Sequence, residues 1–416
     1  MSLNKATISV LFSQSSAMLY GGGFLIFVPL NLSAIEQGFW FLLMALGAMS
    51  RLADMGFLQL VLTYSGHAKV GSERHQREVA FFTAQWRNKV LFGVFPLIFI
   101  VGIGIISLRE FELIIMLSWA WYIIALAILF YLNYFLAIIE GSGGITFSHY
   151  SRGSVYILAS ILTALVLNYS HSLIALPLGI FIAVLIVLFW VLKTKSSYFL
   201  VGKKNLQETA LLKVEFIQLF KKTSMSWTGG YLGTHAIVPL VYVFLGPISS
   251  GLAGMTLNVF LALQNFSNVF LVSIIPTITG HIATKSQWLA REILLRGLFK
   301  SLGVFIFVVT TFSLLVYLYP SNIISERIFH DENLIFLSVG FGLQIVITSI
   351  AIYIRAHKKE PFALMSLVTS ILGVLVLLIT LNSNFSNWVF LGFFISSLLA
   401  LIWSVKILFN WRQAFE

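Results

Sequence analysis

The chain has 416 residues, of which 59% are hydrophobic and only 10% are charged, and its mean hydropathy is +0.95. A soluble domain is about 25% charged and 45 to 50% apolar, so this composition excludes an aqueous globular fold. Cysteine is absent, which excludes disulfides, thiol nucleophiles and thiolate metal sites. The net charge of +11 does not indicate a nucleic-acid partner, because the basic residues are spread over short loops.

Long apolar stretches recur along almost the whole sequence. A helix needs about 20 mostly apolar residues to cross a hydrocarbon core that is roughly 30 Å thick. Because lipid offers the backbone no hydrogen bonds, these stretches are predicted to be α-helices. The first stretch is too long for a signal peptide and lacks its cleavage site, so we expect a retained helix. About twelve spans are predicted, at 7–30, 39–65, 90–107, 112–137, 145–167, 173–192, 223–245, 251–279, 298–319, 333–354, 361–381 and 387–409.

The charged residues of the loops predict the orientation of these helices. If the chain starts in the cytoplasm, 23 of its 26 Lys and Arg residues lie on the cytoplasmic side, and the exceptions are Arg51, Arg109 and Arg327. This is the positive-inside distribution of membrane proteins. The sequence therefore predicts an all-α, polytopic membrane protein with both termini in the cytoplasm.

The longest loop, 193–222, is predicted to be cytoplasmic, and it divides the spans into two sets of six. We therefore expect two lobes, residues 1–205 and residues 206–416. The first helices of the two lobes share a weak pattern, including the segment VPL at 28–30 and at 238–240. Repeated halves of this kind place a substrate path between them.

Polar side chains recur on one face of the first and of the seventh predicted span, because their spacing follows the helical period. The residues are Ser9, Ser13, Ser16 and Tyr20 in the first span and Lys221, Ser224, Thr228, Tyr231 and His235 in the seventh. Two interpretations remain open: small polar residues permit close packing of helices, or these faces line a water-filled cavity. The amide side chains of the eighth predicted span also have two interpretations. They form hydrogen bonds to neighbouring helices, or they offer donors and acceptors to sugar hydroxyls. These amides are Asn258, Gln264, Asn265 and Asn268.

The second predicted span contains the only full charges expected at mid-depth, Arg51 and Asp54. Charges at such depth are costly and usually face an interior cavity. Their spacing suits an ion pair that neutralises itself. Alternatively, Arg51 binds a phosphate or diphosphate, while Asp54 orients it or carries a coupling proton. His235 is a second coupling candidate, because histidine changes its charge near neutral pH, although a lone membrane histidine also serves as a structural hydrogen-bonding residue.

Basic residues gather at the predicted cytoplasmic ends of several spans. They are interpreted either as ordinary positive-inside anchors or as a mouth that gathers an anionic lipid head group. The residues are His149, Arg152, Arg355, His357, Lys358 and Lys359. The segment around Val79, Phe82 and Trp86 is predicted to form an amphipathic helix at the inner membrane surface.

Several segments resemble the Wzx-type oligosaccharide flippases of the multidrug, oligosaccharidyl-lipid and polysaccharide exporter superfamily. The segments are SAIEQGFW at 33–40, DMG at 54–56, SGH at 65–67, EG at 140–141, Pro276 and YIRAHKKEP at 353–361. The resemblance implies a V-shaped bundle of two six-helix lobes around a central, often cationic cavity in a bacterial inner membrane. It also implies flipping of undecaprenyl-diphosphate-linked sugar repeat units, the O-antigen precursors of lipopolysaccharide, to the periplasmic leaflet, with the O-antigen polymerase machinery as a partner. The sequence departs from that picture because Arg51 is its only arginine at mid-depth.

We therefore expect a flippase that works by alternating access, with no catalytic residue, cofactor or metal and with a lipid-linked oligosaccharide and the bilayer as its partners. The expected substrate-binding residues are Arg51, Ser13, Tyr20, Arg152, Ser224, Thr228, Tyr231, His235, Asn258, Gln264, Asn265 and Arg355, and the expected coupling residues are Asp54 and His235. One alternative is a multidrug-type antiporter, whose cavity would need acidic residues of which only Asp54 is a candidate. Another is an O-antigen polymerase or ligase, which the short outer loops disfavour.

Overall fold

The computed structural model describes residues 5–415 with the exception of 71–72, 110–111, 196–205, 285, 331, 358–360, 384 and 386. These residues form α-helices joined by short turns, and there is no β-strand among them. Within the described part, eleven helices are long and apolar enough to cross a membrane. The chain is therefore an all-α, multi-pass membrane protein, as its composition predicts.

The helices group into two compact units, Met1–Trp227 and Thr228–Glu416, which we call unit 1 and unit 2. The division falls inside α10 (Leu206–Thr234), so this helix contributes to both units. The lobe boundary expected after residue 205 coincides with the start of α10, and the loop residues before it lie outside the described part.

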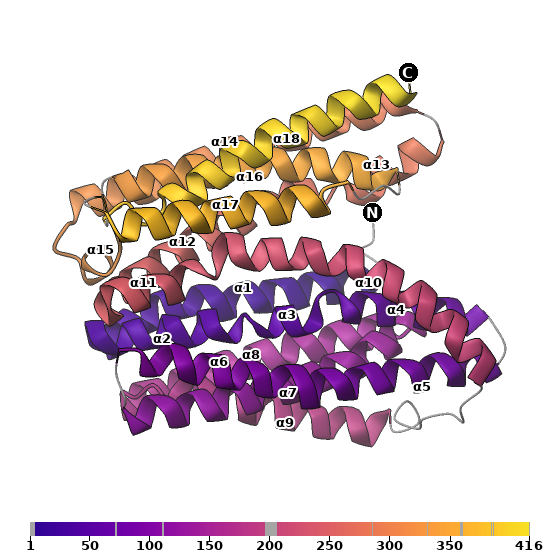
Figure 1. The fold of residues 1–416 in the computed structure, drawn as a ribbon, viewed down its shortest axis with the longest axis horizontal. Helices are drawn as coiled ribbons and strands as arrows, with labels where there is room; N and C mark the ends of the chain where they lie inside the picture. The colour runs from indigo at the N-terminus through magenta and orange to yellow at the C-terminus, as the bar shows by residue number, and fades with distance from the viewer. Residues whose placement is uncertain are drawn as a thin grey trace. The chain divides into compact units, whose positions relative to one another are not determined.

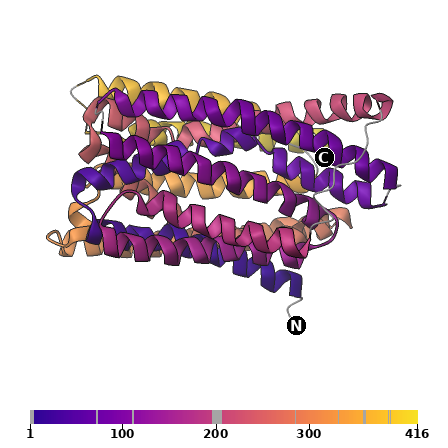
Figure 2. The ribbon, with the colours of Figure 1, turned by 90° about the horizontal axis from the view of Figure 1, so that it is seen from below.

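Unit 1 is built around α7, a helix that packs against α2, α4, α6, α8 and α9. Its long helices run roughly along one common direction in both views (Figures 1 and 2). Trp119 and Tyr134 of α7 are among the largest fully buried side chains. The helices of unit 1 that precede α10 are α1 (Lys5–Asn31), α2 (Ala34–Gly47), α3 (Ser50–Asp54), α4 (Phe57–Val70), α5 (Glu73–Lys89), the π-helical turn η1 (Val90–Val94), α6 (Phe95–Ser107), α7 (Leu113–Gly141), α8 (Ile145–Ser170) and α9 (Ala175–Thr194).

The segment predicted to lie at the membrane surface is α5, and it continues through η1 into α6 without a break. Its apolar face is covered by protein, because Val79 and Phe82 are only 3% and 5% exposed. The rings of Phe82 and Trp86 lie 5.3 and 5.6 Å from the ring of Phe216 on α10. Part of the apolar pattern of this segment is therefore used in packing against protein, including Phe216 of α10.

Unit 2 is built around α16, which packs against α12, α13, α14 and α18. Its helices after α10 are α11 (Ile237–Leu245), α12 (Pro247–Val272), α13 (Ile275–Ala283), α14 (Gln287–Leu318), α15 (Ile323–Glu326), α16 (Glu332–Ala356), α17 (Ala363–Leu381) and α18 (Leu391–Phe415). The helices α17 and α18 approach so closely that a Cβ on Gly392 would lie 2.3 Å from the carbonyl oxygen of Gly373. Only glycine fits at this crossing, as is common between helices that pack in membranes.

This crossing generates a stability prediction. We expect Gly392→Ala to lower the free energy of unfolding by about 1 to 3 kcal/mol, because the added methyl group forces two backbones apart. Thermal unfolding of the purified protein in detergent measures this change. Gly303→Ala is the matched control, because a Cβ at Gly303 meets nothing within 4 Å. Equal unfolding temperatures for the two variants would contradict the tight crossing.

Candidate functional site

The second predicted span is not one helix. It consists of α2, α3 and α4 end to end, interrupted after Gly47 and again after Asp54. At the second interruption Met55 and Gly56 both have positive φ, 42° and 80°. Non-helical backbone at membrane depth is tolerated only where protein buries it or where it lines a water-filled cavity. Broken spans are also where transporters bind their substrates and coupling ions, so this one is the first candidate for a functional site.

The short helix α3 carries both charged residues of the span. The carboxylate of Asp54 accepts a hydrogen bond from the backbone N–H of Leu58 at 2.8 Å, and it therefore caps the first turn of α4. The side chain of Arg51 is exposed, whereas Asp54 is half-buried. The two predicted members of an ion pair thus have different surroundings, and Asp54 has a structural task of its own.

Tyr122 of α7 holds the first interruption in place. A Cβ on Gly47 would lie 2.4 Å from the Tyr122 ring, so the ring rests directly on the end of α2. One turn earlier on α7, the indole N–H of Trp119 donates to the carbonyl of Phe99 at 3.0 Å. The rigid helix α7 therefore positions the broken span, although no sequence pattern singled out Tyr122.

Buried polar atoms lie in the aromatic cluster beside this break. The ring of Tyr20 on α1 packs on Phe24 at 4.9 Å and on Tyr156 at 6.0 Å, and Phe24 packs on Trp40 at 5.5 Å. Neither the Tyr20 hydroxyl nor the Trp40 indole N–H has a hydrogen-bond partner among the described residues. A buried donor without a partner costs about 1 to 3 kcal/mol, so water or a ligand group is expected here.

The serines of the first predicted stripe are buried where α1 packs against α8. Ser13 is 7% exposed, and a Cβ on Gly153 of α8 would lie 3.2 Å from its Cα atom. The hydroxyl of Ser16 donates to the carbonyl of Phe12 on its own helix at 2.7 Å. These contacts favour the packing interpretation for the two serines, whereas the buried Tyr20 hydroxyl has no hydrogen-bond partner among the described residues.

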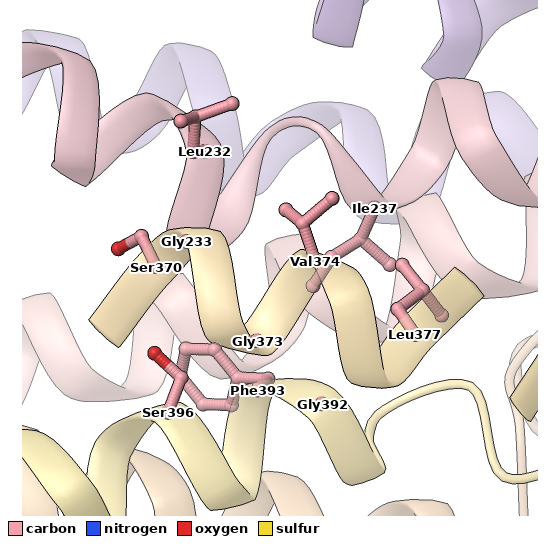
Figure 3. Close-up of a pocket in the computed structure, with 10 residues that line it drawn as sticks. All are labelled: Leu232, Gly233, Ile237, Ser370, Gly373, Val374, Leu377, Gly392, Phe393 and Ser396. Atoms are coloured by element: carbon pink, nitrogen blue, oxygen red, sulfur yellow. The ribbon is translucent and has the colours of Figure 1, made fainter. Parts of the chain in front are cut away.

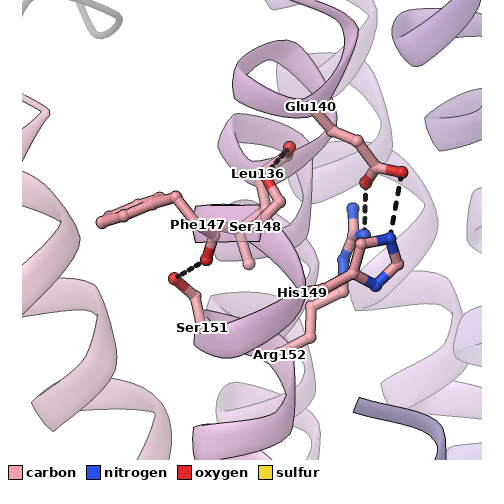
Figure 4. Close-up of polar contacts among 7 residues, drawn as sticks. All are labelled: Leu136, Glu140, Phe147, Ser148, His149, Ser151 and Arg152. Atoms are coloured by element: carbon pink, nitrogen blue, oxygen red, sulfur yellow. Dashed lines mark hydrogen bonds and ion pairs between the residues drawn. The ribbon is translucent and has the colours of Figure 1, made fainter. Parts of the chain in front are cut away.

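A second charged cluster lies where α7 turns into α8 (Figure 4). The carboxylate of Glu140 forms an ion pair with the guanidinium of Arg152, and its other oxygen lies 3.4 Å from Nε2 of His149. The turn between the helices is tight, with Gly143 at a positive φ of 95°. Arg152, an expected substrate ligand, thus has an acidic partner within unit 1 that its sequence neighbourhood did not reveal.

In unit 2 the seventh span is broken as well, between α10 and α11. The backbone N–H groups of His235 and Ala236 both donate to the carbonyl of Tyr231, and the Tyr231 and His235 rings stack at 6.0 Å. Thr228 is half-buried, and the hydroxyl of Ser224 donates to the carbonyl of Lys221 at 2.9 Å. Part of the hydrogen-bonding capacity of the predicted polar face is therefore used within the helix, and Tyr231 is only 8% exposed.

A small pocket lies beside this break, between α10, α11, α17 and α18 (Figure 3). The hydroxyl-bearing side chains in its wall are Ser370 and Ser396, and the rest of the wall is glycine and apolar carbon. The pocket has room for about one water molecule. It is therefore too small to be the site of a sugar or of a drug-sized molecule.

The amides of the eighth span differ in their contacts. Asn258 donates to the carbonyl of Gly254 on its own helix at 2.7 Å, which is a packing role. Gln264 is half-buried and Asn265 is exposed. The Oδ1 atom of Asn268 is buried and has no hydrogen-bond partner among the described residues. Gln264, Asn265 and Asn268 are thus the amides with capacity for further hydrogen bonds.

The last turn of α16 carries the basic cluster of unit 2. Arg355 is exposed, with its guanidinium 5.8 Å from the centre of the Phe362 ring. The Tyr353 hydroxyl accepts a hydrogen bond from Nε of Arg291 at 3.1 Å, and Nδ1 of His357 lies 2.9 Å from the Tyr353 carbonyl oxygen. Arg291 joins this cluster from α14, a contact that the sequence analysis missed. Lys358 and Lys359 lie outside the described residues.

Comparison with solved structures shows which fold the chain shares. It matches the lipid II flippase MurJ in an inward closed conformation with a TM-score of 0.68 and 12% identity, over 97% of this chain and 87% of that one. It matches an inward-facing multidrug resistance MATE family transporter of the MOP superfamily with a TM-score of 0.67 and 13% identity, over 99% and 100% of the two chains. A structure of the MATE multidrug transporter DinF-BH matches with a TM-score of 0.60 and 17% identity, over 97% and 94%.

The search of protein-family models gave no match, and neither did the search of curated proteins. At identities below 20%, the structural likeness concerns the fold. The chain therefore has the fold of these transporters, and none of the three named structures is described as an enzyme.

The cap at the broken span gives a prediction. We expect Asp54→Ala to lower the free energy of unfolding by about 0.5 to 2 kcal/mol, because the N–H of Leu58 loses its acceptor. Asp54→Asn keeps an oxygen in the same place and should lose less. Thermal unfolding in detergent tests both variants, with Glu326→Ala, at an exposed residue of α15, as the control. Equal losses for the Ala and Asn variants would assign the effect to charge instead of the cap.

Proposed function

We propose that this protein is a flippase that moves undecaprenyl-diphosphate-linked O-antigen repeat units from the cytoplasmic to the periplasmic leaflet of a bacterial inner membrane by alternating access. The fold supports a transporter, because it is shared with MurJ and with MATE transporters. The observation that carries the proposal is an exposed arginine on a broken span, Arg51 of α3.

The position of Arg51 favours an aqueous path for an anion. It lies near the middle of the segment formed by α2, α3 and α4, which spans residues 34–70. An arginine at this depth that faced hydrocarbon would cost about 2.5 to 3.5 kcal/mol or more, so an exposed one is expected to face water. Its planar fork of donors matches phosphate oxygens in pairs. A diphosphate linker between a lipid and a sugar is an anion of this kind.

The sugar part requires hydrogen-bonding groups that a substrate can reach. We assign this role to the half-buried or exposed side chains of Thr228, His235, Gln264 and Asn265, and to the unused hydroxyl of Tyr20. Such groups replace the hydrogen bonds of water and remove the cost of moving hydroxyl groups through hydrocarbon. Ser13, Ser224, Tyr231 and Asn258 are more buried or bonded within their own helices, and they support these groups.

The exposed guanidinium of Arg355 supports capture of the head group. A cluster of cations at the inner membrane surface attracts anionic head groups over about a Debye length. Arg152 differs, because it would have to leave Glu140 before it could bind a phosphate. We therefore propose that Arg355, and not Arg152, binds the head group where it enters from the inner membrane surface. The O-antigen polymerase machinery is a proposed partner that receives the product.

Complementation tests the proposal directly. The protein is expressed in a strain that lacks its own O-antigen flippase and carries the matched repeat-unit synthesis, and the lipopolysaccharide ladder is read on a gel. We expect the protein to restore the ladder and Arg51→Ala to reduce it at least tenfold at equal membrane abundance, because one charge-assisted contact is worth about 1.5 to 3 kcal/mol. Arg109→Ala, in an exposed loop, is the control.

The absence of a ladder from the wild-type protein would exclude this function. A full ladder from Arg51→Ala would restrict Arg51 to a structural role.

Coupling to a proton gradient is a further part of the proposal, with Asp54 and His235 as the candidate residues. Asp54→Asn preserves the cap on α4 and removes the charge. We expect this variant, in liposomes, to lose most of the acceleration that an imposed pH gradient gives to the wild-type protein. Transport by Asp54→Asn that responds to the gradient as the wild-type does would remove Asp54 from coupling.

A multidrug-type antiporter is the second candidate function, because MATE transporters share the fold equally well. The observation that favours it is the half-buried acid Asp54 beside a helix break. Export of a cationic dye from cells, sensitive to Asp54→Asn and independent of Arg51, would select this function over the flippase.

A further inference from the structure

We propose that Glu140, His149 and Arg152 form a proton-binding site at the end of unit 1 that the charge pattern predicts to be cytoplasmic. The ligand is a proton, and His149 is the group that takes it up. This inference rests on the proposed transport function and deepens it, because it names a site through which cytoplasmic pH sets the rate of transport.

The geometry of the cluster brings three ionisable groups to one point (Figure 4). Glu140 ends α7, and His149 and Arg152 lie one turn apart on the same face of α8. Their side chains are only 16%, 18% and 23% exposed. The cluster is thus enclosed enough for a change of charge to matter and open enough for a proton to reach it.

His149 is the member that can change its charge near neutral pH. Arginine is not deprotonated in proteins, and an ion pair such as that of Arg152 with Glu140 carries no net charge. The charged groups that act on His149 within the described part are Glu140 from α7 and Arg152 from α8 itself. The lysine near the end of α9, Lys195, lies 5.5 Å from the centre of the Phe147 ring, and Lys5 of α1 is exposed.

The second ring nitrogen of His149 links the proton to the conformation of the turn. Nε2 faces the carboxylate of Glu140, whereas Nδ1 is buried and has no hydrogen-bond partner among the described residues. If Nε2 carries the hydrogen of the neutral ring, the added proton goes to Nδ1 and creates a buried donor. Such a donor requires an acceptor, so proton uptake must admit water or shift the turn between α7 and α8.

The alternative is that the cluster only stabilises the turn between α7 and α8. His149→Gln separates the two roles, because an amide nitrogen can still donate to Glu140 but does not titrate. His171→Gln is the matched control, since His171 is an exposed histidine at the other end of α8.

The first measurement is independent of transport. The full-length protein with isotope-labelled histidine rings is titrated in lipid nanodiscs by NMR between about pH 5 and 8. The signal that disappears in His149→Gln is that of His149. We expect this signal to shift with pH along a titration curve, and a signal that does not titrate in this range would overturn the proposal.

The second measurement is transport of the lipid-linked oligosaccharide in vesicles as the pH on the predicted cytoplasmic side is varied with no gradient imposed. We expect the wild-type and His171→Gln rates to change severalfold over about pH 5 to 8, and the His149→Gln rate to stay within twofold. A pH profile of His149→Gln equal to that of the wild-type would overturn the proposal. No transport by any variant would refute the proposed function, and the NMR titration would then still decide whether His149 binds a proton.

Discussion

Backbone hydrogen bonding in lipid is the constraint on which the rest of this structure depends. A chain inside the bilayer must satisfy its own N–H and C=O groups, so apolar stretches become helices and every interruption needs a local substitute. The break in the second span has such a substitute, because the N–H of Leu58 donates to the side-chain carboxylate of Asp54. The break is therefore built into the fold, and the charged side chains beside it are part of its construction.

The spans could be predicted from the sequence because their signal is local. Length and hydropathy placed several helices within a few residues of their observed bounds, as in the predicted span 112–137 and the helix Leu113–Gly141, whereas the predicted span 298–319 misses the first two to three turns of α14 (Gln287–Leu318). The breaks could not be predicted, because Met55 adopts a positive φ that its residue type disfavours. Glycine, the residue at position 56, is frequent in membrane helices and does not by itself predict a break. The broken span packs against α7, and such tertiary contacts leave no mark in hydropathy or in the helical period.

For the candidate site, the sequence predicted which residues are polar or charged better than it predicted what each of them does. Arg51 and Asp54 stand three residues apart, and that spacing is the same whether the carboxylate pairs with the arginine or caps a helix. Arg152 and Glu140 are twelve residues apart across a tight turn, so helical periodicity alone could not join them. Hydroxyl groups show the same ambiguity: Ser16 bonds to its own helix, while the Tyr20 hydroxyl has no hydrogen-bond partner in the part of the chain that the structure describes.

Unit 1 therefore holds polar groups in three energetic states that have different consequences for movement. A satisfied group such as the Asp54 carboxylate stabilises one conformation of the break. An exposed charge such as Arg51 makes that conformation costly wherever lipid replaces water. A buried group without a partner among the described residues, such as the indole N–H of Trp40, favours any rearrangement that brings it an acceptor. Because all three adjoin one broken span, a ligand that changed the surroundings of one of them would alter the balance among them, and the proposed transport requires such a shift of a conformational equilibrium.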